Sequence, residues 1–149
     1  MYERIYQFDS LQSEFIVATR VDSIDGWLSK IMTGKTILIV DDERDIRETL
    51  QEILEMEGFQ TLVAANGKEA LERLRLVERP CLILLDMMMP VVNGWEFLAE
   101  REKDESLARI PVVVVTATGK KMVPAQIDEY IKKPVELDEL MLVVKKYCS

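Results

Sequence analysis

From Lys35 onward the chain alternates short apolar runs with amphipathic segments. The runs are rich in β-branched residues, and several are apolar at consecutive positions, which is typical of strands that are buried on both faces of a parallel sheet. They cover Thr36–Val40, Gln60–Ala64, Cys81–Leu85, Pro111–Thr116 and the weaker Glu129–Lys132. We therefore predict five strands.

Apolar residues at helical spacing lie between and after these runs. They predict helices over Ile46–Leu54, Ala70–Val77, Trp95–Lys103 and Leu137–Lys146. Strands that alternate with helices in this way indicate an α/β fold, a doubly wound parallel sheet with right-handed crossovers and helices on both faces.

Residues 1–34 stand outside this pattern. Their apolar positions have roughly helical spacing and predict one or two amphipathic helices: Phe8, Leu11, Phe15, Val21, Ile24, Leu28 and Ile31. We expect an N-terminal extension over 1–34 and a main domain over 35–149. The extension packs on the domain or carries a binding function, or translation starts at Met32.

Composition and charge restrict the kind of partner. The chain has 149 residues, 48% of them apolar, and its longest apolar runs are far too short to span a bilayer. No secretory signal is visible, so we expect a cytoplasmic protein with no membrane contact. The net charge of −8 argues against direct nucleic-acid binding and favours a protein or a cation as ligand.

Two residue counts exclude several chemistries. The chain has no histidine, which excludes Ser-His-Asp catalysis, histidine-bound zinc and a phosphohistidine of its own. Cys81 and Cys148 are too few for a four-cysteine metal site. They are far apart in sequence and make no disulfide framework, so we expect a reducing, cytosolic setting.

Polar residues follow the predicted strands at the ends where function gathers in open parallel sheets. Asp41 and Asp42 end the first strand, Asp86 the third and Thr116 the fourth, while Lys133 follows the fifth. Each has an ordinary structural explanation when taken alone. Together they predict one polar crevice at the carboxyl edge of the sheet.

Three carboxylates at one edge repel one another, by about 4 kcal/mol per ionised pair at 4 Å and an effective dielectric of 20. Oxygen ligands of this kind fit Mg²⁺, and Lys133 supplies a second positive charge. Without histidine or a positioned cysteine, the available nucleophile is an aspartate that attacks phosphorus. Thr116 could donate its hydroxyl to a phosphoryl oxygen.

The motifs ILIVDDE, LILLDMMMPVVNGWEFL, VVVVTAT and YIKKP carry these residues. With them, the chain from about Met32 to Ser149 resembles the receiver domain of two-component response regulators, in its chemotaxis-regulator-like, stand-alone form. The resemblance implies a flavodoxin-like sheet of order 2-1-3-4-5. It also implies that Asp86 is the phospho-acceptor, and that Thr116 and Lys133 contact the phosphoryl group.

The same resemblance assigns the remaining site residues. Asp42 and Asp86 would ligate Mg²⁺ directly, Asp41 through water, and Met88 through its main-chain carbonyl. It implies a cis bond between Lys133 and Pro134, and a switch in which Tyr130 moves inward with Thr116.

One departure from the family pattern concerns the fourth crossover. Only 16 residues separate Thr116 from Lys133, and they include Pro124. We therefore expect a shortened fourth helix and a modified output face. A second departure is Met88 beside the phosphoryl site, whose bulk predicts slow autodephosphorylation.

The sequence thus predicts a receiver that accepts a phosphoryl group on Asp86, with Mg²⁺, from a histidine kinase or a histidine phosphotransfer protein. It would signal to a downstream protein by a conformational shift, and a homodimer is possible. The alternative is a phosphorylation-independent interaction module on the same fold. An enzyme is not expected, because a Mg²⁺-dependent phosphatase would usually carry a second aspartate where Met88 stands.

Overall fold

The computed structural model describes residues 35–76, 79–118 and 123–149. They belong to one compact unit, Gly34–Ser149. The helices expected between residues 1 and 34 lie outside the described residues, so the division into an extension and a main domain stays a prediction. None of the described helices is long and apolar enough to cross a membrane.

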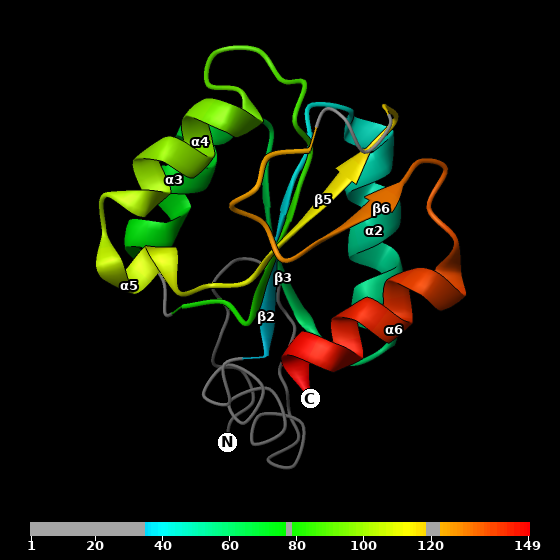
Figure 1. Cartoon of the computed structure of the whole chain (residues 1–149). Coiled ribbons are helices and arrows are strands. Elements are labelled where there is room, and N and C mark those ends of the chain that lie inside the picture. Colours follow the sequence, from blue (N-terminus) through cyan, green and yellow to red (C-terminus); the bar gives the residue numbers. More distant parts are fainter. Residues whose placement is uncertain (1–34, 77–78, 119–122) are drawn as a thin grey trace, which may run out of the picture. The chain divides into compact units, whose positions relative to one another are not determined.

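One five-stranded parallel sheet forms the centre of the unit, with strand order β3-β2-β4-β5-β6 (Figure 1). In chain order this is the predicted 2-1-3-4-5. The strands are β2 (Thr36–Val40), β3 (Gln60–Ala64), β4 (Leu82–Leu85), β5 (Val112–Thr116) and β6 (Glu129–Lys132). The predicted strands agree with them to within one residue at each end.

Helices cover both faces of this sheet (Figure 1). Their bounds are α2 (Arg44–Met56), α3 (Gly67–Leu76), α4 (Gly94–Glu102), α5 (Glu105–Ala108) and α6 (Leu137–Cys148). The four predicted helices are confirmed in type and place. The one-turn helix α5 was not predicted; its first turn begins where the Asp104 side chain accepts a hydrogen bond from the Ser106 N–H.

The strands are apolar on both faces because each face has its own core. Leu38 and Val40 of β2 point into the cluster under α3 and α4, whereas Ile37 and Ile39 point into the cluster under α2 and α6. The same alternation runs through β4 and β5. Side-chain period 2 therefore explains why these strands read as continuous apolar runs.

The segment between β5 and β6 departs from the usual crossover. Residues 117–118 and 123–128 form no helix, and the four residues 119–122 lie outside the described part. Val123 and Ile127 instead pack against the core cluster below α3 and α4. The described residues on either side of 119–122 thus form no helix, in agreement with the expectation that a full-length fourth helix is missing.

The two cysteines form a disulfide, which contradicts the expectation that they make no disulfide framework. Cys81 directly precedes β4 and Cys148 ends α6, and their Cα atoms are 5.4 Å apart. Sequence separation concealed the contact, because α6 runs antiparallel to the strands and brings its last turn to the amino end of β4. No free cysteine remains.

We predict that reducing this disulfide lowers the melting temperature. The bond spans 67 positions, and constraining an unfolded loop of that length stabilises the folded chain by about 2–4 kcal/mol, which corresponds to roughly 10 °C. Calorimetry with and without a phosphine reductant tests this. The Cys148→Ser variant is the control, because its melting temperature should not respond to the reductant; an equal response of both proteins contradicts the prediction.

Candidate functional site

The acidic pair follows β2 at the carboxyl edge of the sheet. Asp41 is buried, while Asp42 is exposed. The Asp41 backbone is held on both sides, since its N–H donates to the Ala64 carbonyl and its carbonyl accepts from the Arg47 guanidinium at 2.8 Å. Its carboxylate also accepts from the Glu43 N–H at 2.9 Å. Asp41 is therefore a fixed acid rather than a mobile loop residue.

Asp86 follows β4, the strand next to β2. Its N–H donates to the Val40 carbonyl at 2.8 Å, which continues the ladder between the two strands one step beyond their ends. Asp86 is only 6% exposed, and its carboxylate accepts a long hydrogen bond, 3.4 Å, from the Met88 N–H. The register of the sheet thus brings Asp41 and Asp86 together.

The loop after Asp86 depends on a close approach by α4. A Cβ atom on Gly94 would lie 2.6 Å from the Met87 Sδ and 2.7 Å from the Met87 Cα, so only glycine fits there. Asn93 closes the start of α4 with a capping box to Glu96. These contacts set the path of the segment that carries Met88.

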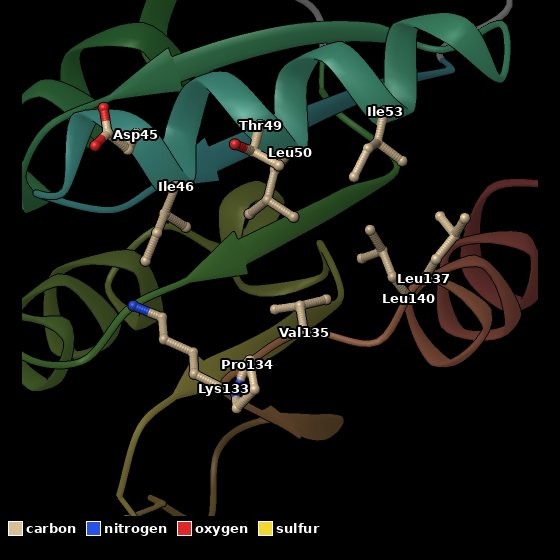
Figure 2. A pocket seen from close by; sticks show the side chains of 10 residues that line it. All are labelled: Asp45, Ile46, Thr49, Leu50, Ile53, Lys133, Pro134, Val135, Leu137 and Leu140. Atoms are coloured by element: carbon tan, nitrogen blue, oxygen red, sulfur yellow. The ribbon is translucent and has the colours of Figure 1, made fainter.

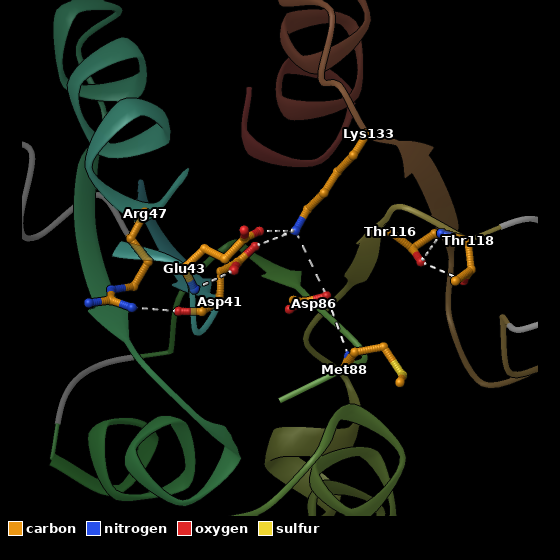
Figure 3. A network of polar contacts seen from close by, with 8 residues as sticks. All are labelled: Asp41, Glu43, Arg47, Asp86, Met88, Thr116, Thr118 and Lys133. Atoms are coloured by element: carbon orange, nitrogen blue, oxygen red, sulfur yellow. Dashed lines mark hydrogen bonds and ion pairs between the residues drawn. The ribbon is translucent and has the colours of Figure 1, made fainter. Parts of the chain in front are cut away.

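The three aspartates form one cluster. One carboxylate oxygen from each of Asp41, Asp42 and Asp86 lies within 4.8 Å of the others. Lys133 lies among them, with its amine 2.9 Å from Asp41, 3.4 Å from Glu43 and 3.9 Å from Asp86 (Figure 3). The peptide bond between Lys133 and Pro134 is cis, as the resemblance implied.

Burial and charge shift the pKa values of two groups in the cluster. Burial, followed by the charge of Asp41, raises the pKa of Asp86 to about 6, although Lys133 and the Met88 N–H act in the opposite direction. Burial alone would lower the pKa of Lys133. Its hydrogen bond to Asp41 and the charges of Asp41 and Asp86 outweigh burial and leave the pKa of Lys133 raised. Lys133 is therefore a permanent cation at neutral pH.

Thr116 ends β5 on the other side of Asp86 (Figure 3). It is 2% exposed, and its hydroxyl lies 2.8 Å from the Thr118 hydroxyl and accepts from the Thr118 N–H at 3.1 Å. Among the described residues no hydrogen bond joins Thr116 to Asp86. Tyr130 lies on β6 beside Val114 and is 37% exposed, which places its ring at the surface of the edge strand.

Two members of the polar network were not predicted as site residues. Glu43 has no part in the crevice predicted from the sequence, yet it shares the Lys133 amine. Arg47 lies one helical turn further along α2 and holds the Asp41 carbonyl. No sequence pattern indicated this contact, because Asp41 and Arg47 are six positions apart and Asp41 precedes the helix.

An apolar groove of about 310 Å³ lies beside the cluster (Figure 2). It runs between α2 and the segment from Lys133 to Leu140, and the lining side chains are Asp45, Ile46, Thr49, Leu50, Ile53, Lys133, Pro134, Val135, Leu137 and Leu140. The Lys133 stem thus lines the groove while its amine reaches the carboxylates.

The donor set fits a hard divalent cation. It consists of carboxylate oxygens only, with no sulfur or imidazole, and Mg²⁺ prefers such ligands and keeps several waters. The exposed Asp42 leaves the cluster open to solvent on one side. A cation there would offset the repulsion among these carboxylates, to which Lys133 is already paired.

The fold and the cluster together define a class of protein. It is a doubly wound parallel domain with a carboxylate cluster and a lysine at the carboxyl ends of its central strands. The family model described as the response regulator receiver domain matches residues 37–145. The chain belongs to this family, whose members are phosphorylated on an aspartate in two-component signalling.

Individual relatives agree with this assignment. The chain is 40% identical over 119 residues to the phosphate regulon transcriptional regulatory protein PhoB of Pseudomonas aeruginosa, covering 76% of this chain and 52% of PhoB. It therefore spans about half the length of that relative. It is 40% identical over 122 residues to sporulation initiation phosphotransferase F of Bacillus subtilis, covering 78% of this chain and 95% of that protein.

A solved structure gives the same result. The response regulator TrrA from Thermotoga maritima, in complex with Mg²⁺ and beryllium fluoride, has a TM-score of 0.66 and 37% identity, over 76% of this chain and 98% of that one.

We predict that Asp86→Asn stabilises the protein in the absence of divalent cations. Because burial raises the pKa of Asp86 from 3.8 to about 6, the folded protein binds this proton more tightly than the unfolded chain does. The free energy of unfolding therefore falls by about 1–3 kcal/mol as pH rises from about 4 to about 6. Removing the charge should remove that loss.

Urea unfolding in EDTA at pH 5 and pH 8 measures this difference. Asp86→Asn should be more stable than the parent at pH 8, while Asp138→Asn, an exposed acid in α6, should behave as the parent. A parent that is equally or more stable than Asp86→Asn at pH 8 contradicts the prediction.

Proposed function

We propose that Asp86 accepts a phosphoryl group from a phosphohistidine of a partner histidine kinase or phosphotransfer protein. The observation that carries the proposal is the cluster of Asp41, Asp42 and Asp86 around Lys133 at one edge of the sheet. These 149 residues contain no histidine, so the donor imidazole in this proposal lies outside them.

In this reaction an Asp86 carboxylate oxygen attacks phosphorus and the P–N bond of the phosphohistidine breaks. The imidazole leaves with the electron pair of that bond and takes up a proton, and an acyl phosphate remains on Asp86. A pKa of about 6 leaves Asp86 mostly ionised, and hence nucleophilic, at neutral pH. Asp42, Asp86 and the Met88 carbonyl would hold Mg²⁺ directly and Asp41 would hold it through water, and the ion would neutralise charge on the transferring group.

Lys133 and Thr116 have complementary parts in this proposal. The Lys133 amine already lies 3.9 Å from Asp86 and can pair with a phosphoryl oxygen. The Thr116 hydroxyl can donate a hydrogen bond to another. The new charge of about −1.5 to −2, by analogy with other phosphoresidues, draws both side chains inward and shifts the population of two conformations.

The output surface in this proposal lies at β6 and the segment before it. Residues 117–118 and 123–128 form no helix, and Tyr130 stands on the neighbouring edge strand at 37% exposure. A downstream protein would therefore recognise a face built from irregular chain and the edge strand β6.

We predict that a small acyl phosphate with Mg²⁺ adds one phosphoryl group to the parent and none to Asp86→Asn. Intact-mass spectrometry measures the addition, and EDTA should abolish it. Asp138→Asn is the matched control and should be labelled as the parent is, because its carboxylate lies in the exposed first turn of α6.

Two results would count against this function. An unlabelled parent would favour the phosphorylation-independent interaction module on the same fold. Steady turnover of small phosphate esters, with Asp86 as nucleophile, would favour a phosphatase.

We also predict that the phosphoryl group on Asp86 is long-lived and that Met88→Asn shortens its life several-fold. Met88 lies two residues after Asp86 and its side chain is 59% exposed, so its thioether can cover the path of an attacking water. An asparagine amide would instead hydrogen-bond that water.

Loss of label from purified phosphoprotein measures the lifetime. Met56→Asn makes the same chemical change at the exposed end of α2 and should leave the rate unchanged. A Met88→Asn protein that loses its label no faster than the parent overturns the role of Met88.

A further inference from the structure

The Thr116 hydroxyl is engaged away from Asp86 in this structure. Its two hydrogen-bond contacts are both with Thr118, one to the hydroxyl at 2.8 Å and one from the N–H at 3.1 Å. Figure 3 shows the Thr118 side chain on the far side of Thr116 from Asp86. Thr118 thus competes with any group on Asp86 for the same hydroxyl.

The backbone of Thr116 is fixed, so it cannot move the Thr116 hydroxyl from Thr118 toward Asp86. Thr116 pairs with Lys132 in the β5–β6 ladder, and its carbonyl accepts from the Lys133 N–H at 2.8 Å. A residue tied in this way can change only its side-chain rotamer or the direction of its hydroxyl proton.

A phosphoryl oxygen on Asp86 would need the proton of the Thr116 hydroxyl, which the contact with Thr118 can occupy. Such an oxygen accepts hydrogen bonds and has no proton to donate, so Thr116 must direct its own proton toward it. The Thr118 N–H can only donate to Thr116. Either hydroxyl can be the donor in the 2.8 Å contact, and when Thr116 donates, its proton points to Thr118 and away from Asp86.

We propose that Thr118 is a positioning residue, a latch that holds the Thr116 hydroxyl in its resting orientation until a phosphoryl group on Asp86 outcompetes it. This inference rests on the proposed function of Asp86. The latch sets how readily the phosphorylated conformation forms, because each molecule that switches must first give up the bond to Thr118.

The resting protein tests the latch without any phosphoryl group. NMR three-bond couplings report the χ1 rotamer of Thr116 in the parent, in Thr118→Val, which loses the hydroxyl but keeps the branched shape, and in Thr118→Ser, which keeps the hydroxyl. We expect one rotamer in the parent and in Thr118→Ser, and rotamer averaging in Thr118→Val. An unchanged Thr116 rotamer in Thr118→Val overturns the latch.

Binding of beryllium fluoride with saturating Mg²⁺, measured by calorimetry, tests its consequence. Thr118→Val should bind this phosphoryl mimic about 2- to 12-fold more tightly than the parent, the factor that corresponds to one neutral hydrogen bond of about 0.5–1.5 kcal/mol. Thr118→Ser should match the parent. Affinity for Mg²⁺ alone should be the same in all three, since that step does not engage Thr116.

A double-mutant cycle separates the latch from a merely structural effect. In a Thr116→Val background, Thr118→Val should leave the affinity for beryllium fluoride unchanged, because the hydroxyl it releases is already absent. The latch is overturned if Thr118→Val, with Thr116 intact, binds beryllium fluoride no more tightly than the parent does. It is also overturned if Thr118→Val raises the affinity equally with Thr116 intact and in the Thr116→Val background. A parent that binds no beryllium fluoride instead refutes the proposed function, and the rotamer measurement still decides the latch.

Discussion

Mutual repulsion among three carboxylates is the constraint around which this domain is arranged. Strands β2 and β4 are adjacent and end in register, and therefore Asp41 and Asp86 leave the sheet side by side with Asp42 close by. Such an arrangement persists only because it is anchored. Lys133 supplies opposite charge, and the backbone of Asp41 is tied to Ala64 and Arg47. Burial, followed by the charge of Asp41, still raises the pKa of Asp86, and a bound cation would offset this remaining cost of ionising it.

Most of the strands and helices could be predicted from the sequence, because the patterns that indicate them are local. Apolar runs such as Ile37–Val40 can be recognised as buried parallel strands without knowledge of their neighbours, and residues at strand ends are brought together by parallel topology itself. For this reason the sequence alone predicts that Asp41, Asp86, Thr116 and Lys133 line one crevice. The strand order came from the family resemblance.

The features that escaped prediction depend on long-range geometry. The Cys81–Cys148 bond joins positions 67 apart, and nothing near either cysteine indicates the other. Glu43 became part of the site only through the reach of Lys133 across the crevice. The role of Thr118 rests on side-chain orientation at the end of β5, which neither composition nor periodicity records.

The disulfide also divides the chain topologically. Together with the backbone from Cys81 to Cys148 it closes a covalent ring that contains β4, α4, α5, β5, β6 and α6. Asp86, Thr116 and Lys133 all belong to the ring, whereas Asp41 and Asp42 lie on the open part of the chain. A single backbone cut inside the ring leaves one molecule, with the acceptor still covalently joined to the two groups that would contact its phosphoryl.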